Sequence, residues 1–143
     1  MLVDFYHLAS TPLERVLPRI CERLIDGGER LLVVAEEESL LRRLDEQLWT
    51  YAPGAFLPHG RTSPKTQPIL LSTALEPLNG AGNVALADGV WREEALAFAR
   101  TFYFFGDGHL DGARGAWRAL KGKAEAEPRY WKRDERGKWV QGP

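Results

Sequence analysis

The chain has 143 residues, of which 44% are hydrophobic and 27% are charged. This length suits one domain around one core, and the composition excludes an intrinsically disordered chain. The formal net charge of −1 argues against a protein that mainly wraps nucleic acid. Residues 113–143, however, hold nine Lys and Arg against four Asp and Glu, a net of +5, which leaves −6 on the first 112 residues. The C-terminal quarter can therefore attract an anionic partner.

Signals for export, membrane insertion and disulfide bonding are missing from the sequence. Cys21 is the only cysteine, so no internal disulfide can form, and no apolar run reaches the ~20 residues of a membrane span. The N-terminal stretch from Met1 to Asp4 lacks the basic start and long apolar segment of a signal peptide. We therefore expect a soluble protein of the reducing cytoplasm.

The N-terminal segment predicts a strand followed by a helix. Residues 2–7 are rich in apolar and aromatic side chains, as in a short strand, and apolar residues at helical spacing then continue to Gly27. Thr11 is expected to cap this helix, with Pro12 at its first position. Pro18 predicts a kink or a restart, because a proline inside a helix removes one backbone donor.

The next segment predicts a buried strand, a second helix, a loop and two more strands. Residues 30–35 contain the unbroken apolar run Leu31-Leu32-Val33-Val34, as expected of a central strand covered on both faces. The second helix should open at Glu36. Its buried side consists of leucines at helical spacing, namely Leu40, Leu41, Leu44 and Leu48. A proline-rich loop is expected over residues 51–68, and strands over residues 67–72 and 83–87.

The last third of the chain predicts a short helix, an aromatic strand, a longer helix and a hairpin. These elements are expected at residues 91–99, 101–105 and 108–121, and the hairpin strands at residues 129–132 and 138–140. The alternation of strands and helices predicts a single α/β domain over the whole chain. Its central sheet should be mostly parallel, with helices on both faces and a C-terminal hairpin.

No assembled site for chemistry is evident in the sequence. The glycine-rich segment 106–112 lies between a strand and a helix, but Asp111 stands where the dinucleotide-binding fingerprint requires its third glycine. The three histidines, His7, His59 and His109, are not at metal-ligand spacing. No catalytic residue, metal or cofactor is therefore predicted. A nucleotide-dependent α/β enzyme remains an alternative, because active sites form in space and not in sequence.

One stretch of the sequence is specific enough to indicate a family. Residues 44–49 read Leu-Asp-Glu-Gln-Leu-Trp, and residues 56–59 read Phe-Leu-Pro-His. The opening at residues 3–6, Val-Asp-Phe-Tyr, and the late segment at residues 113–118 provide further matches. Together these motifs resemble the chi subunit family of the bacterial DNA polymerase III holoenzyme, over most of residues 1–121.

The resemblance implies a Rossmann-like fold without a nucleotide and a non-catalytic accessory subunit that links two proteins. One partner would be the psi subunit of the clamp-loader assembly, bound through Trp49, Phe56 and Pro58. These aromatic side chains beside a rigid loop would suit a binding hot spot. The alternative interpretation is that Trp49 and Phe56 only seal the core under the loop.

The other implied partner is the acidic, aromatic-ended C-terminal tail of single-stranded-DNA-binding protein. The matching positions on the last helix are Arg114, Trp117, Arg118 and Lys121, where Trp and Arg replace the Tyr and Lys familiar in the family. At about 100° per residue these cations border one edge of the indole. The alternative is a solvated basic helix face.

The basic C-terminal extension, residues 122–143, has two interpretations. Aromatic and basic residues alternate in it: Tyr130, Trp131, Lys132, Arg133, Lys138 and Trp139. They can form an edge hairpin that closes the sheet, which we favour, or stack on single-stranded DNA as a small binding module. In the adaptor interpretation contact with DNA is mostly indirect. A repair helicase is a further partner that the sequence alone does not decide.

Overall fold

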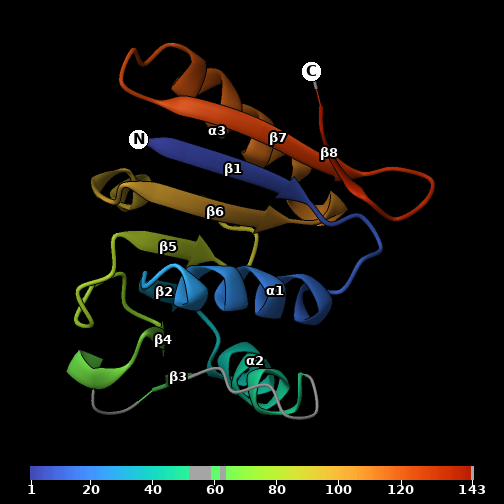
Figure 1. Cartoon of the computed structure of the whole chain (residues 1–143). Coiled ribbons are helices and arrows are strands. Elements are labelled where there is room, and N and C mark those ends of the chain that lie inside the picture. Colours follow the sequence, from blue (N-terminus) through green and yellow to red (C-terminus); the bar gives the residue numbers. More distant parts are fainter. Residues whose placement is uncertain (52–58, 62–63, 143) are drawn as a thin grey trace.

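The computed structural model describes residues 1–51, 59–61 and 64–142, and within them one eight-stranded sheet (Figure 1). Its strands are β1 Leu2–His7, β2 Leu31–Val34, β3 His59–Gly60, β4 Ile69–Ser72, β5 Asn83–Leu86, β6 Arg100–Phe105, β7 Glu127–Arg133 and β8 Trp139–Gln141. The helices of the described part are α1 Leu13–Asp26, α2 Glu38–Thr50 and α3 Leu110–Lys121, with 3-10 segments η1 Pro64–Thr66, η2 Glu93–Ala97 and η3 Asp107–His109. The predicted α/β fold is confirmed.

The strand order is β3-β4-β2-β5-β6-β1-β7-β8, and every neighbouring pair is parallel except β7 and β8. The central strands β2 and β5 are buried along their whole length. Continuous apolar runs are typical of parallel strands covered on both faces, as the run at residues 30–35 predicts. The antiparallel β7–β8 pair is the expected C-terminal hairpin.

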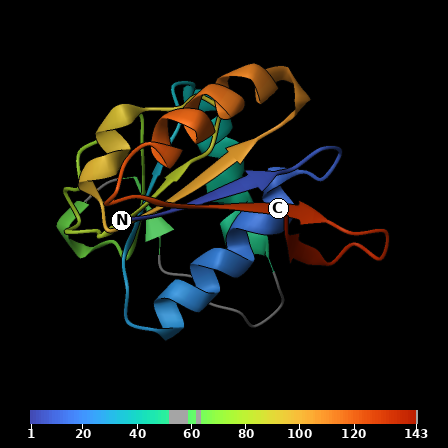
Figure 2. The ribbon, with the colours of Figure 1, turned by 90° about the horizontal axis from the view of Figure 1, so that it is seen from above.

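Helices cover both faces of the sheet. Seen from above in Figure 2, α1 and α3 lie on opposite sides of the strands. The predicted apolar stripe of α1 is fully buried and consists of Leu13, Val16, Leu17, Ile20, Cys21 and Leu24. On the other face α3 buries two alanines and one leucine, namely Ala113, Ala116 and Leu120. The rest of its surface is partly or fully exposed to solvent.

The beginning of α1 differs from the prediction. The helix begins at Leu13, and Pro12 occupies the cap position without a side-chain capping hydrogen bond. The Thr11 hydroxyl instead accepts a hydrogen bond from Arg133 of the hairpin at 3.1 Å, so the predicted Thr11 cap is wrong. The helix is continuous through the buried Pro18, so the restart is also wrong. The kink stays a prediction.

The helix predicted at residues 91–99 is only the short segment η2. The backbone amides of Ala99 and Arg100 donate to the carbonyl of Gly82 at 2.9 and 3.2 Å. These bonds draw the chain into β6 and leave space for one 3-10 turn. The predicted helix is wrong because strand pairing wins over local helical preference.

Two other boundaries also need correction. Helix α2 begins at Glu38 and not at Glu36, because the Glu36 backbone amide donates to the Asp88 carboxylate at 2.9 Å. The segment 51–68 is not only a loop, since it contains β3 and η1. The short β3 is stabilised by parallel pairing with β4, which local sequence patterns cannot reveal.

A buried aspartate joins the hairpin to the rest of the sheet. Asp4 of β1 is fully buried and accepts hydrogen bonds from Arg100 at 2.9 Å, Arg129 at 2.7 Å and the Trp131 indole at 2.9 Å. This cluster lies on the α1 side. Because side chains alternate along a strand, Tyr130 points to the α3 side, where it packs with the second core cluster.

Candidate functional site

A pocket of about 390 Å³ lies between α3 and the strands β1, β6 and β7. Its floor is aromatic and consists of Phe5, Phe105 and Trp117. The Phe5 and Trp117 rings meet edge to face with centroids 5.2 Å apart, and Trp117 meets Tyr130 in the same way at 6.5 Å. Phe5 is buried and Trp117 is half-buried, so the indole connects the core to the open pocket.

One rim of the pocket carries positive charge from α3. Arg114 and Arg118 line the pocket together with Trp117. The Lys121 ammonium lies 5.1 Å from the centre of the Trp117 ring, as in a cation–π contact. Arg114 has only a loose contact with Asp111, at 4.0 Å, and its side chain is 64% exposed. The structure therefore brings the four α3 residues singled out in the sequence together around one aromatic ring.

The opposite wall comes from β1 and β7. The Nδ1 atom of His7 lies 3.0 Å from the Tyr130 hydroxyl, and its Nε2 atom lies 2.8 Å from the Asp107 carboxylate. The His7 ring stacks on Phe105 with centroids 5.2 Å apart. Burial raises the pKa of Tyr130, and the nearby Arg114 opposes this change. His7 and Tyr130 are 123 positions apart, and no local sequence pattern assigns either residue to this site.

The family of the DNA polymerase III chi subunit, HolC, matches residues 1–126. The chain belongs to this chi subunit family. No curated protein matches the chain. Membership indicates an accessory role in DNA replication. The matched region runs from β1 through α3 and includes the α3 rim of the pocket, but it ends before β7 and therefore before Tyr130.

The α2 part of the chi-family signature region, residues 44–49, lies on the α1 side of the sheet. Trp49 is 61% exposed there, so the interpretation that it seals the core is wrong. Its indole packs on the ring of the buried His59, with centroids 4.7 Å apart, and His59 is paired with Asp45. Phe56 and Pro58 lie outside the described residues.

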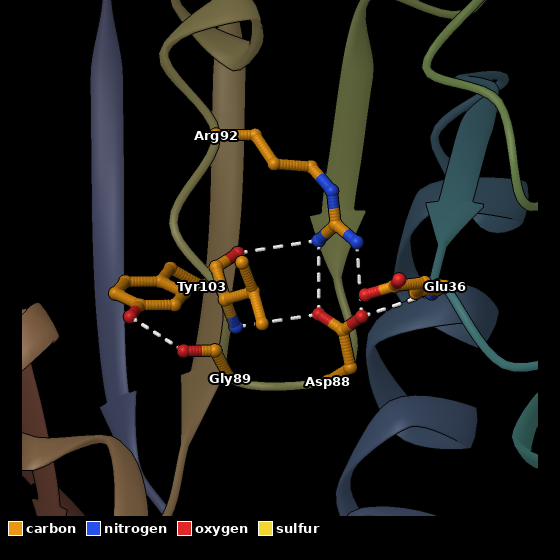
Figure 3. Close-up of polar contacts among 6 residues, drawn as sticks. Glu36, Asp88, Gly89, Arg92 and Tyr103 are labelled. Atoms are coloured by element: carbon orange, nitrogen blue, oxygen red, sulfur yellow. Dashed lines mark hydrogen bonds and ion pairs between the residues drawn. The ribbon is translucent and has the colours of Figure 1, made fainter.

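At the switch point of the sheet, where open α/β sheets in general bind ligands, this chain has an ion pair between Asp88 and Arg92. From β2 the chain passes through α2 toward the β3 edge of the sheet, whereas from β5 it passes to β6, in the direction of the opposite edge. The topological switch point therefore lies at the carboxyl ends of β2 and β5. There the Asp88 carboxylate accepts two hydrogen bonds from Arg92, both at 2.9 Å, and one from the Glu36 amide (Figure 3). The Val90 amide donates to it as well. The carboxylate is thus fully engaged.

The aromatic side chains of the hairpin also have partners within the fold. Trp131 stacks on Tyr6 with ring centroids 6.2 Å apart, and Trp139 meets Tyr6 edge to face at 5.3 Å. This packing supports the edge-hairpin interpretation over a stacking platform for single-stranded DNA. No group of His, Cys, Asp and Glu suited to a metal occurs among residues 1–51, 59–61 and 64–142. In the same part of the chain, no helix has the length and apolar character of a membrane span.

Proposed function

We propose that this chi-family chain is a non-catalytic adaptor of DNA polymerase III in the cytoplasm. It would link the psi subunit of the clamp-loader assembly to the acidic C-terminal tail of single-stranded-DNA-binding protein. The observation that supports the proposal most is the pocket on α3, which combines an aromatic floor with a rim of exposed arginine side chains. An acidic peptide that ends in an aromatic residue has the complementary chemistry.

The chemistry of the pocket suggests how such a tail would bind. The terminal aromatic ring would pack against Trp117 above the buried Phe5, where edge-to-face contacts add to the burial of apolar surface. The carboxylates would pair with Arg114 and Arg118, whose forked guanidinium groups suit carboxylates. Because both arginines are exposed, each pair contributes little alone, and together they accelerate encounter with an acidic partner.

The proposed psi-facing surface is separate from this pocket. Trp49 belongs to α2, whose buried leucines share one core cluster with α1, whereas the pocket is lined by α3 on the opposite face of the sheet. An indole with 61% exposure at a helix end is available as an anchor for a partner protein. With the sheet between the two surfaces, both partners can bind at the same time.

Fluorescence polarisation of a labelled tail peptide would test the tail site. Because Arg118 is exposed on α3, we expect Arg118→Glu to weaken binding by about 1–2 kcal/mol, or about 5- to 30-fold. Trp117→Ala removes the aromatic platform and should cost about 2 kcal/mol or more. Wild-type binding should weaken with added salt, because the rim charges are exposed.

Arg19→Glu provides a matched control, since Arg19 is an exposed arginine on α1 across the sheet. This variant should bind the peptide like wild type, and circular dichroism should show that all variants are folded. If Arg118→Glu and Trp117→Ala both bind as tightly as wild type, the pocket is not the tail site. The basic hairpin would then be the next surface to test.

A further inference from the structure

The wall of the pocket opposite α3 carries a polar relay that the α3 residues do not explain. Asp107, His7 and Tyr130 form a chain of two hydrogen bonds, and His7 and Tyr130 both line the pocket. We propose that Tyr130, oriented by His7, is a second ligand-binding group, whose hydroxyl donates to a carboxylate of the bound acidic peptide while His7 takes up a proton. This inference rests on the proposed function and extends the site onto β1 and β7.

The direction of the two hydrogen bonds follows from the chemistry of their partners. An ionised carboxylate only accepts hydrogen bonds, so the Nε2 atom of His7 must carry the hydrogen that lies toward Asp107. In a neutral imidazole the other nitrogen, Nδ1, is then an acceptor. The Tyr130 hydroxyl must donate to it, at 3.0 Å. With neutral His7, therefore, Tyr130 can offer the pocket only an oxygen lone pair, which repels a carboxylate.

Protonation of His7 reverses the second hydrogen bond. The Nδ1–H of an imidazolium donates to the Tyr130 oxygen, and the hydroxyl hydrogen becomes free to point at a carboxylate in the pocket. The imidazolium also adds one positive charge to the wall. An anionic ligand therefore prefers protonated His7, and by linkage its binding takes up protons and strengthens as the pH falls.

Other charged groups also surround His7. The two pockets that share His7 are also lined by Arg114 and Arg118 of α3 and by Lys132, Arg133, Asp134 and Glu135 of the hairpin, and Asp107 of η3 pairs with its ring. Lysine, arginine and carboxylate side chains ordinarily titrate outside the interval from about pH 6 to pH 8, whereas histidine titrates within it. Besides His7, His109 of η3 precedes the pocket residue Leu110, so the assignment of a pH dependence to the His7–Tyr130 pair rests on the variants below.

The position of Tyr130 is fixed by the hairpin. Its backbone pairs with Phe5 of β1, and its carbonyl accepts a hydrogen bond from the Gly142 amide at 2.8 Å. A Cβ atom at Gly142 would lie 2.5 Å from the Tyr130 ring, so the absence of a side chain there lets the chain pack against the ring. Burial keeps the pKa of Tyr130 above its ordinary value, so the hydroxyl retains its proton at neutral pH.

The experiment is calorimetric titration of an acidic, aromatic-ended peptide into the full chain near pH 6 and pH 8, in buffers of different ionisation enthalpy. Wild type should bind roughly three- to tenfold tighter near pH 6, with net proton uptake. Tyr130→Phe removes only the hydroxyl and should weaken binding near pH 6 by about tenfold. Tyr51→Phe, the same change on the other side of the sheet, should have no effect.

Asp107→Asn separates the relay from a merely structural role. An asparagine amide can donate to the Nε2 atom of His7, which allows the hydrogen to sit on Nδ1 without protonation of the ring. This variant should therefore bind more tightly than wild type near pH 8 and show a flatter pH profile. Asp107 is 78% exposed, so the fold should tolerate the change.

The outcomes also distinguish this inference from the proposed function. If Arg118→Glu weakens binding but Tyr130→Phe binds like wild type and the wild-type profile is flat between pH 6 and pH 8, the tail site holds and the relay is wrong. If wild type does not bind the peptide at either pH, the proposed function fails. Proton uptake that is smaller in both Tyr130→Phe and Asp107→Asn than in wild type would support the relay.

Discussion

Replacing Asp4 by Asn tests what joins the C-terminal hairpin to the sheet. The Asp4 side chain is fully buried, and it forms ion pairs with Arg100 at 2.8 Å and Arg129 at 2.7 Å. Asparagine has the same shape but no charge, so two cations lose their counter-ion. Breaking a buried pair costs about 3–5 kcal/mol, and the lower end applies because the two arginine side chains remain 33% and 29% exposed. We expect a loss of about 3 kcal/mol in the free energy of unfolding.

Acidification provides a second test of the same cluster. Burial alone would raise the pKa of Asp4, but hydrogen bonds from Arg129, Trp131 and Arg100 hold it below its usual range. A carboxyl whose folded pKa is lowered stabilises the fold fully above its unfolded pKa of about 4, and this contribution is lost as the pH falls through the folded value. The gap in stability between wild type and Asp4→Asn should therefore narrow between pH 7 and about pH 3.

Urea unfolding followed by tryptophan fluorescence and circular dichroism measures both effects. Asp26→Asn is the matched control, because Asp26 is exposed at the end of α1, and it should change the free energy of unfolding by less than about 0.5 kcal/mol. An Asp4→Asn protein as stable as wild type at pH 7 would refute the assigned role of the carboxylate. A gap that does not change on acidification would show that the ion pairs are not its cause.

Three other outcomes are expected. Trp49→Ala should lower the free energy of unfolding by less than about 1 kcal/mol, because the indole is 61% exposed. Leu48→Ala, at a buried neighbour, should lower it by about 2–5 kcal/mol. Equal losses for the two variants in urea unfolding would place Trp49 in the core. Asp88→Asn should destabilise the fold by about 2 kcal/mol at pH 7 in the same assay and less in acid. Burial raises the pKa of Asp88, but the ion pair with Arg92 and the hydrogen bonds from the Glu36 and Val90 amides together lower it below its usual value. Calorimetry with ATP, GTP and NAD should show no saturable binding, and a micromolar isotherm that disappears when Gly106 is changed would favour the nucleotide-dependent enzyme.

Local patterns predicted the elements that are defined by their own residues. The apolar run in β2 and the apolar stripe of α1 give clear signals. A strand buried on both faces is apolar at every position, and a helix buried on one face has apolar residues at helical spacing. The family resemblance, and not the local pattern, singled out Arg114, Trp117 and Arg118 in the α3 half of the pocket. Alternating aromatic and basic residues around a turn indicated the hairpin.

Features that depend on long-range pairing could not be predicted. Strand β7 of the hairpin pairs in parallel with β1, and Phe5 lies opposite Tyr130. This register brings the Tyr130 hydroxyl to the His7 ring. Nothing in the sequence near His7 or Tyr130 indicates this contact. Asp4 gave no signal for its two arginine partners for the same reason. The 3-10 segment η2 was overestimated as a helix because its length is set by where β6 begins pairing.

The central claim, that the chain joins two proteins on opposite sides of one sheet, is tested most directly by sequential capture. A surface carrying the tail peptide would first bind the chain and then be exposed to purified psi subunit. Wild type should give two successive binding steps, Trp49→Ala only the first, and Arg118→Glu a weakened first step. Release of the chain from the peptide when psi is added, or an unchanged second step with Trp49→Ala, would contradict the adaptor with two separate surfaces.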